Sequence, residues 1–241
     1  MPDQRSSSKF RFSCEKPTNV DESGYKHRMS SDLFAPFAEL ASKLLPLQSG
    51  GDGAHDLSHL IRVWGNVKTI QREAGGDLEI LAAAVLLHDC VEVPKNSPLR
   101  SQASRLAAEE AITRLSALGW REERSSWVAS TIESHSYSAG VAPVTLEGSI
   151  LQDADRLDAI GFTGIARCFY TAGRMGSAIY EPSDPRGERR VLNDSAFALD
   201  HFPAKLLNLA QGFRTATGRL LAAQRHETVV SFYSGLLAEV E

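Results

Sequence analysis

The stretch LAAAVLLHDCVE, from Leu81 to Glu92, contains an apolar run that ends in a histidine and an aspartate side by side, His88 and Asp89. Asp77 precedes this stretch at the position of a helix cap, so the sequence predicts a buried helix from Leu78 to about Asp89. Polar side chains at the end of a buried helix cost free energy unless they are paired or bind a cation. His88 and Asp89 are therefore either a structural pair or ligands.

The segments on both sides of this stretch also show the pattern of helices. Apolar residues recur at three- and four-residue spacing, and Gly75-Gly76 separates two of these segments. The predicted helices cover 32–45, 56–74, 78–89, 101–119, 121–135, 146–160 and 164–172, and helical structure resumes from 197 to the C-terminus. Residues 176–195 are rich in Gly, Pro and charge and are predicted to be a loop or lid. The pattern indicates an all-α fold.

Length and composition are those of an ordinary globular protein. The chain has 241 residues, of which 42% are apolar and 23% charged, which is enough for one substantial core. Residues 1–30 are polar and show no periodicity, so we expect a flexible N-terminal leader before a single helical domain over 31–241.

Several classes of protein are disfavoured by charge, cysteine content and the N-terminus. The net charge is −4 and the pI is about 6.0, so we expect no specific nucleic-acid binding. Three widely spaced cysteines without a CxxC pair argue against a disulfide framework or a zinc–thiolate site. The sequence shows neither a signal peptide nor a run of apolar residues that could span a membrane, so we expect a cytoplasmic location without membrane contact.

Histidines and aspartates gather in a few other places along the helical segments. AHDLSHLIRVW contains His55, Asp56 and His59, ESHSYS contains His135, and LQDADRLDAIG contains Asp153, Asp155 and Asp158. The histidine groups alone are weak signals, whereas Asp153 and Asp155 inside an apolar helix are more telling, because a buried carboxylate costs free energy unless it is paired or bound to a cation. Together, imidazole and carboxylate groups on separate helices can surround one divalent ion such as Mn²⁺, Mg²⁺, Co²⁺, Ni²⁺ or Fe²⁺.

The ordered set AHDLSHLIRVW, LLHDCVEVPKNSPLR, ILQDADRLDAIGFTGIAR and ALDHFPAKL resembles the HD-domain metal-dependent phosphohydrolases, in particular their bacterial YedJ-type branch. The resemblance covers about residues 35–235 and implies a single HD-domain helical bundle. It implies one divalent metal ion, with Mn or Mg favoured, and a small phosphorylated substrate, a nucleotide first among them. The metal ligands implied are His59, His88, Asp89 and Asp155, with Asp153 as the alternative to Asp155 because residues two apart on a helix point about 200° apart.

Further roles are assigned by chemistry. The candidates for the catalytic base or for orienting water are His55, Asp56 and Glu92, and Lys95 is a catalytic and substrate-binding candidate. The other candidate contacts of the substrate phosphate are Arg100, His135, Arg156 and Arg167.

Two other functions are compatible with this pattern. Some HD-type folds host di-iron oxygenases, although His135 is the one obvious spare ligand here. A non-catalytic nucleotide sensor is the second alternative. The apolar C-terminal segment VVSFYSGLL is either core or a contact surface of a homo-oligomer.

Overall fold

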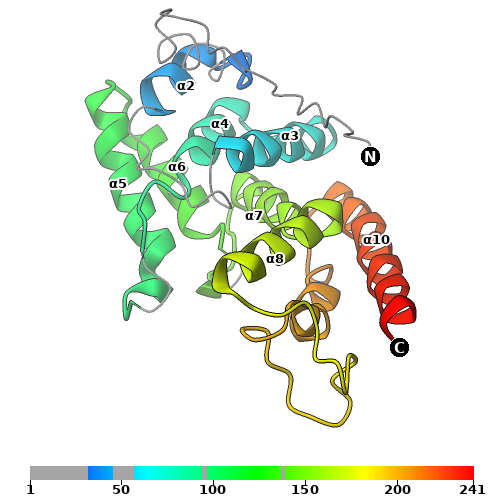
Figure 1. Cartoon of the computed structure of the whole chain (residues 1–241). Helices are drawn as coiled ribbons and strands as arrows, with labels where there is room; N and C mark the ends of the chain where they lie inside the picture. The colour runs from blue at the N-terminus through cyan, green and yellow to red at the C-terminus, as the bar shows by residue number, and fades with distance from the viewer. Residues whose placement is uncertain (1–31, 46–56, 94–96, 137–138) are drawn as a thin grey trace, which may run out of the picture.

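Helix α4 (Leu78–Leu87) lies at the centre of the fold and packs against α2, α3, α5, α6 and α7. The computed structural model describes residues 32–45, 57–93, 97–136 and 139–241, and these form a single all-helical domain (Figure 1). The predicted leader over 1–30 and the candidate residues His55, Asp56 and Lys95 lie outside the described residues.

Most of the remaining elements follow the predicted pattern with shifts at their ends, whereas the predicted helical segment from 197 onward is divided into η4, α9, η5 and α10. The α-helices are α2 (Ala38–Leu44), α3 (Leu57–Ala74), α5 (Ala103–Ala117), α6 (Glu122–Glu133), α7 (Leu146–Asp158), α8 (Gly161–Met175), α9 (His201–Ala204) and α10 (Ala216–Val240). Short 3₁₀ turns occur at η2 (Arg100–Gln102), η4 (Ala198–Asp200) and η5 (Leu206–Asn208). In the described ranges, β pairing is limited to one bridge between Ala178 and Phe197.

Local interactions explain where two of the helices begin. The Asp77 side chain accepts hydrogen bonds from the backbone N–H groups of Glu79 and Ile80, which confirms its predicted role as the cap of α4. The first predicted helix begins at Ala38 instead of residue 32, because Pro36 disfavours a helical conformation at the residue before it.

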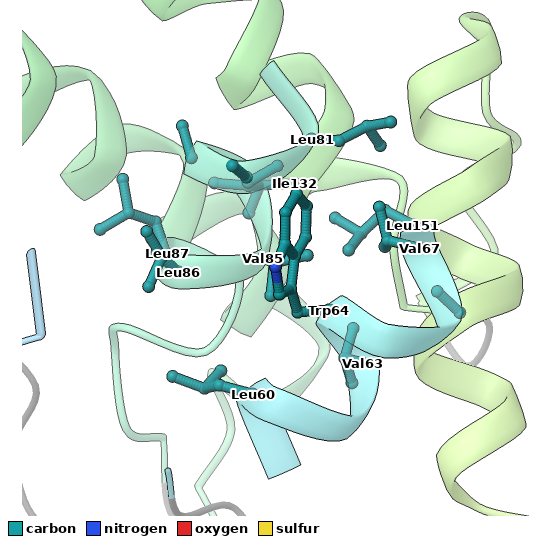
Figure 2. Close-up of a cluster of buried hydrophobic side chains, with 14 of the residues drawn as sticks. Leu60, Val63, Trp64, Val67, Leu81, Val85, Leu86, Leu87, Ile132 and Leu151 are labelled. Atoms are coloured by element: carbon teal, nitrogen blue, oxygen red, sulfur yellow. The ribbon is translucent and has the colours of Figure 1, made fainter. Parts of the chain in front are cut away.

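Helix α4 has no solvent-facing side between Ile80 and Leu87, since every one of these residues is 0% exposed. Trp64 of α3 packs in the same core beside Val85 and Ile132 (Figure 2). The ring of Trp64 also stacks on Phe34. The C-terminal end of α4 is thus held in place by packing from all sides.

A second, smaller core joins α8, α9 and α10. Its buried members include Ile165, Leu199, Phe202 and Val229. Tyr180, in the predicted loop or lid over 176–195, packs against this core. Arginines of the same segment form ion pairs, and Arg190 pairs with Asp200 of η4. Arg186 similarly pairs with Glu241 at the end of the chain. The described segment is therefore tied to the domain.

Helix α10 is fastened to α3 and α7 by a polar clamp. The Arg225 guanidinium donates to the carbonyl oxygen of Leu157, at 2.5 Å, and to Asn66 Oδ1, at 2.9 Å. Asn66 in turn donates to the carbonyl oxygen of Ala154. None of the helices in the described ranges is long and apolar enough to cross a membrane.

Candidate metal centre

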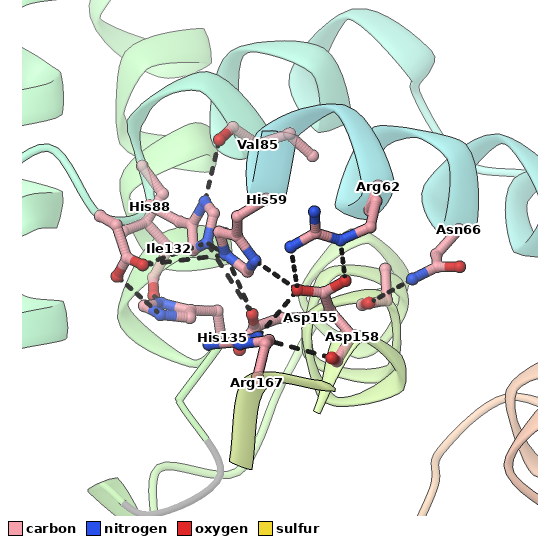
Figure 3. A network of polar contacts seen from close by, with 12 residues as sticks. His59, Arg62, Asn66, Val85, His88, Ile132, His135, Asp155, Asp158 and Arg167 are labelled. Atoms are coloured by element: carbon pink, nitrogen blue, oxygen red, sulfur yellow. Dashed lines mark hydrogen bonds and ion pairs between the residues drawn. The ribbon is translucent and has the colours of Figure 1, made fainter. Parts of the chain in front are cut away.

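Three helices bring the four predicted metal ligands together. His59 lies on α3, His88 and Asp89 follow the last turn of α4, and Asp155 lies on α7 (Figure 3 shows the network). Both histidines are 1% exposed, whereas the Asp89 side chain is 40% exposed. The cluster is therefore closed on its protein side and open to solvent beside Asp89.

The ligand atoms are spaced as they would be around one ion. His59 Nε2 lies 3.2 Å from His88 Nε2, 3.5 Å from Asp155 Oδ1 and 3.9 Å from Asp89 Oδ2. His88 Nε2 lies 3.6 Å from Asp89 Oδ2 and 4.0 Å from Asp155 Oδ1. Bonds of about 2.1 Å in tetrahedral or octahedral geometry put neighbouring ligand atoms roughly 3.0–3.4 Å apart. His59, His88 and Asp89 therefore form a group that could hold a divalent ion after small adjustments, and Asp155 lies beside both histidines.

Hydrogen bonds at Nδ1 set the direction of each imidazole. His88 Nδ1 donates to the carbonyl oxygen of Val85 at 2.9 Å, and His59 Nδ1 donates to Asp158 Oδ2 at 2.8 Å. Because carbonyl and carboxylate oxygens only accept, the proton sits on Nδ1 and the Nε2 lone pair faces the cluster. This is the arrangement by which proteins orient metal-binding histidines.

The two histidines have opposite electrostatic environments. Burial disfavours the imidazolium of His59, but the hydrogen bond to Asp158 and the charges of Asp155 and Asp89 outweigh it and raise the pKa of His59. Burial dominates at His88 and lowers its pKa, which favours the neutral ring that a metal ion needs.

The structure separates the two candidates for the last ligand. Asp155 faces the histidines, whereas Asp153 is 0% exposed and accepts hydrogen bonds from the backbone of the segment before α10. Its carboxylate oxygens lie 2.9 Å from the Arg214 nitrogen and 2.7 Å from the Thr215 nitrogen. Asp155 therefore faces the metal centre and Asp153 anchors α10.

Asp158 supports the centre without facing it. Besides His59, its carboxylate accepts from Arg62 Nε at 2.6 Å and from Arg167 at 2.8 Å. Burial raises the pKa of Asp158, but the hydrogen bonds from His59 and Arg62 outweigh it and hold the pKa well below its usual range. Arg62 was not among the sequence candidates, and its signal was its position three residues after His59 on the same helix face.

Replacing Asp158 by asparagine should weaken metal binding by about 10- to 100-fold without abolishing it, because the group that orients His59 loses its charge. Titration calorimetry with Mn²⁺ measures the change. The matched control is Glu147→Gln, which alters another buried acid on α7 that accepts from the Asp77 nitrogen, away from the cluster. Equal metal affinity in Asp158→Asn and the native protein would contradict the proposed role of Asp158 in orienting His59.

One cavity is lined by two of the candidate ligands, and a second shares Arg100 with it. The smaller, of about 310 Å³, is lined by His88, Asp89, His135 and Arg100, and the larger, of about 440 Å³, by Arg100 and Arg167. His135 Nδ1 donates to the carbonyl oxygen of Ile132, so its Nε2 faces Asp89 Oδ1 at 3.9 Å. The structure thus places three of the predicted phosphate contacts, Arg100, His135 and Arg167, beside the metal centre.

Two other candidates lie elsewhere. Arg156 is 5% exposed, and its two terminal nitrogens donate to the carbonyl oxygens of Leu209, Gln211 and Gly212. Its guanidinium holds the turn before α10, and its role as a phosphate contact stays a prediction. Glu92 is exposed and, in the described part of the chain, makes no polar contact with the four ligands.

Cys90, next to the ligand pair, is a packing residue. It is 5% exposed, its thiol donates to the carbonyl oxygen of Ala107, and burial raises its pKa to about 11. A thiol that stays protonated at neutral pH is a poor metal ligand. Cys90 is therefore a small residue of the core.

Comparison with known proteins gives consistent matches. A model of the HD domain matches residues 56–160. The protein YpgQ of Bacillus subtilis (strain 168) is 33% identical over 190 residues, which cover 77% of this chain and 84% of YpgQ. The crystal structure of Bacillus subtilis YpgQ in complex with ADP matches with a TM-score of 0.63 and 29% identity, over 87% of this chain and 97% of that one. An HD-superfamily hydrolase from Bacillus thuringiensis matches with a TM-score of 0.60 and 27% identity, over 90% and 97% of the two chains.

Proposed function

The chain belongs to the HD-domain family, and from that premise we propose that it is a metal-dependent phosphohydrolase that acts on a small phosphorylated metabolite, a nucleotide first among them. The convergence of two imidazole nitrogens and two carboxylates beside cation-lined cavities carries the proposal. The hydrolase from Bacillus thuringiensis and the ADP complex of YpgQ support it. The ordered sequence motifs also favour the YedJ-type branch of the family.

The ligand set fits one divalent ion. His59, His88, Asp89 and Asp155 would hold it, and their mixture of imidazole and carboxylate favours Mn²⁺ or Mg²⁺ over thiolate-binding metals. When bound, such an ion supplies Lewis-acid polarisation of a phosphoryl oxygen and of a water molecule.

Side chains of the protein would offset the charge of the substrate and bind its phosphate group. Arg100 and Arg167 line the cavities and would offset the negative charge that grows on phosphoryl oxygens during cleavage. His135 presents Nε2 toward Asp89 and, when Nε2 carries a proton, can donate a hydrogen bond to a phosphate oxygen. The base that takes a proton from water stays a prediction among His55, Asp56 and Glu92.

A cross of metals and substrates tests the proposal. We expect Mn²⁺ or Mg²⁺ to support release of phosphate or pyrophosphate from one group of nucleoside mono-, di- or triphosphates or cyclic nucleotides. EDTA should stop the release and added metal should restore it, because the reaction needs the ion. Ion chromatography of the products identifies the bond that breaks.

Metal counting, oxygen dependence and nucleotide binding discriminate the two rival functions. Two iron atoms per chain with oxygen-dependent turnover would favour the di-iron oxygenase. Nucleotide binding by the metal-loaded protein with neither phosphate nor pyrophosphate released would favour the sensor.

A further inference from the structure

Arg62 lies three residues after His59 on α3, on the same side of the helix, and reaches the carboxylate of Asp158 on α7 (Figure 3). Its Nε donates to Asp158 Oδ1 at 2.6 Å, and its Nη2 donates to Asp158 Oδ2 at 3.1 Å. Two parallel hydrogen bonds between a guanidinium and a carboxylate fix the plane of both groups. Arg62 therefore holds the orientation of the Asp158 carboxylate.

The same carboxylate binds His59. Asp158 Oδ2 accepts from His59 Nδ1 at 2.8 Å, so two side chains of one helix share one buried acid. The terminal torsion of an aspartate has a broad energy minimum, so a single hydrogen bond does not fix the direction of its oxygens. The bidentate pair with Arg62 removes this freedom and keeps Oδ2 directed at the imidazole of His59.

Arg167 contacts this carboxylate in a different way. Its Nη1 donates to Asp158 Oδ2 at 2.8 Å. This contact connects α7 with α8, which follow each other in the chain, whereas Arg62 connects α3 with α7 over 96 positions. Of these two arginines, Arg62 is the one that fastens the helix of His59 to the helix of Asp155.

The pair of Arg62 and Asp158 joins the two helices at the level of the candidate metal ligands. His59 Nε2 and Asp155 Oδ1 face each other there at 3.5 Å. One turn after Arg62, Asn66 donates to the carbonyl oxygen of Ala154 at 2.9 Å and makes a second connection between α3 and α7. Loss of Arg62 is therefore expected to loosen the ligand geometry without separating the helices.

We propose that Arg62 is a positioning residue of the metal centre, which holds the Asp158 carboxylate in the orientation that directs His59 toward the ion. Arg62 acts through Asp158 and contacts neither the ion nor the substrate in this role. The inference rests on the metal centre of the proposed function and is independent of which phosphorylated compound is cleaved.

Metal affinity tests the role of Arg62. We expect Arg62→Met to raise the dissociation constant of Mn²⁺ by about tenfold or more, which is the usual effect of removing a group that orients a metal ligand. Arg62→Lys should recover part of the affinity, because an ammonium group keeps the charge but cannot form the bidentate pair. Titration calorimetry measures both variants. The matched control is Arg72→Met, which removes an exposed arginine from the last turn of the same helix.

A double-mutant cycle tests whether Arg62 acts through Asp158. Arg62→Met made in the Asp158→Asn variant should raise the dissociation constant of Mn²⁺ by a clearly smaller factor than it does in the native protein, because the group through which it acts is already altered. Equal factors in the two backgrounds would show that Arg62 affects the metal centre by another route, and would overturn the proposal.

Proton NMR of the metal-free protein separates positioning from a general loss of structure. His59 Nδ1–H and His88 Nδ1–H are both buried and hydrogen-bonded, the first to Asp158 and the second to the carbonyl oxygen of Val85. In Arg62→Met we expect the His59 proton to exchange faster with water and the His88 proton to keep its native rate. The His88 proton is thus an internal reference within the same protein.

The outcomes separate this inference from the function on which it rests. Unchanged Mn²⁺ affinity in Arg62→Met, or equal acceleration of exchange at His59 and His88, would overturn the role of Arg62 even if the protein hydrolyses nucleotides. Conversely, Mn²⁺ binding that depends on Arg62 and Asp158 together, in a protein that cleaves no phosphorylated compound, would support the role of Arg62 and refute the hydrolase.

Discussion

Replacing Asp89 by alanine is expected to abolish metal binding and hydrolysis together. Asp89 Oδ2 lies 3.6 Å from His88 Nε2 and 3.9 Å from His59 Nε2, so the substitution removes a charged ligand from the middle of the cluster. A loss of several kcal/mol of charge stabilisation corresponds to a decrease of about 10³-fold or more in activity. Titration calorimetry with Mn²⁺ and phosphate release measure the two effects.

The fold should survive this substitution. The Asp89 side chain is 40% exposed and follows the buried part of α4, so its removal opens no cavity in the core. Far-UV circular dichroism should therefore match that of the native protein. Glu109→Ala serves as the control, because it removes an exposed acid of α5 that pairs with Arg105. Full activity of Asp89→Ala would rule out the proposed centre.

Replacing Asp153 by alanine is expected to produce the largest loss of stability. Its carboxylate is fully buried and accepts from the Arg214 nitrogen, the Thr215 nitrogen and Thr215 Oγ1, at 2.7–3.1 Å. The alanine variant leaves these donors without a partner where they hold the start of α10. We expect a decrease of about 3 kcal/mol in the free energy of unfolding, which is roughly 6–12 °C in Tm for a chain of this size.

The contrast with Asp155→Ala makes this prediction specific. The two aspartates lie on the same helix, and Asp155 has a 28% exposed side chain that faces the histidines. Asp155→Ala should therefore lose metal affinity with little change in Tm, and Asp153→Ala should lose stability and keep the metal site. Thermal unfolding and metal titration of both variants measure the pair. The reverse assignment of the two effects would show that Asp153 is the ligand.

Local patterns in the sequence were sufficient to predict most of the helices and the candidate ligand pair, His88 and Asp89. Gly75-Gly76 and Asp77 determine where α3 ends and α4 begins, because glycine adopts the positive φ of a turn and the aspartate caps the next helix. The four predicted metal ligands followed from the order of motifs that resembles the HD family, and the structure brings those four residues together.

The roles that were missed depend on contacts between residues far apart in the chain. Asp153 accepts from the backbone 61 and 62 positions away, and Arg156 donates to carbonyl groups more than 50 positions away. Periodicity on one helix gives the face of a side chain but not the segment that will cover it. The larger cavity has the same origin, since its lining residues Arg100 and Lys205 come from separate elements that are far apart in the chain.

The complete burial of α4 from Ile80 to Leu87 restricts how this chain can vary. Each residue inserted into or deleted from an α-helix turns everything after it by about 100°. An insertion within α4 would therefore either displace large side chains from the core or rotate His88 and Asp89 away from His59 and Asp155. We therefore expect every functional variant of the chain to keep the length of α4. Insertions in the loops around this helix are expected to be tolerated.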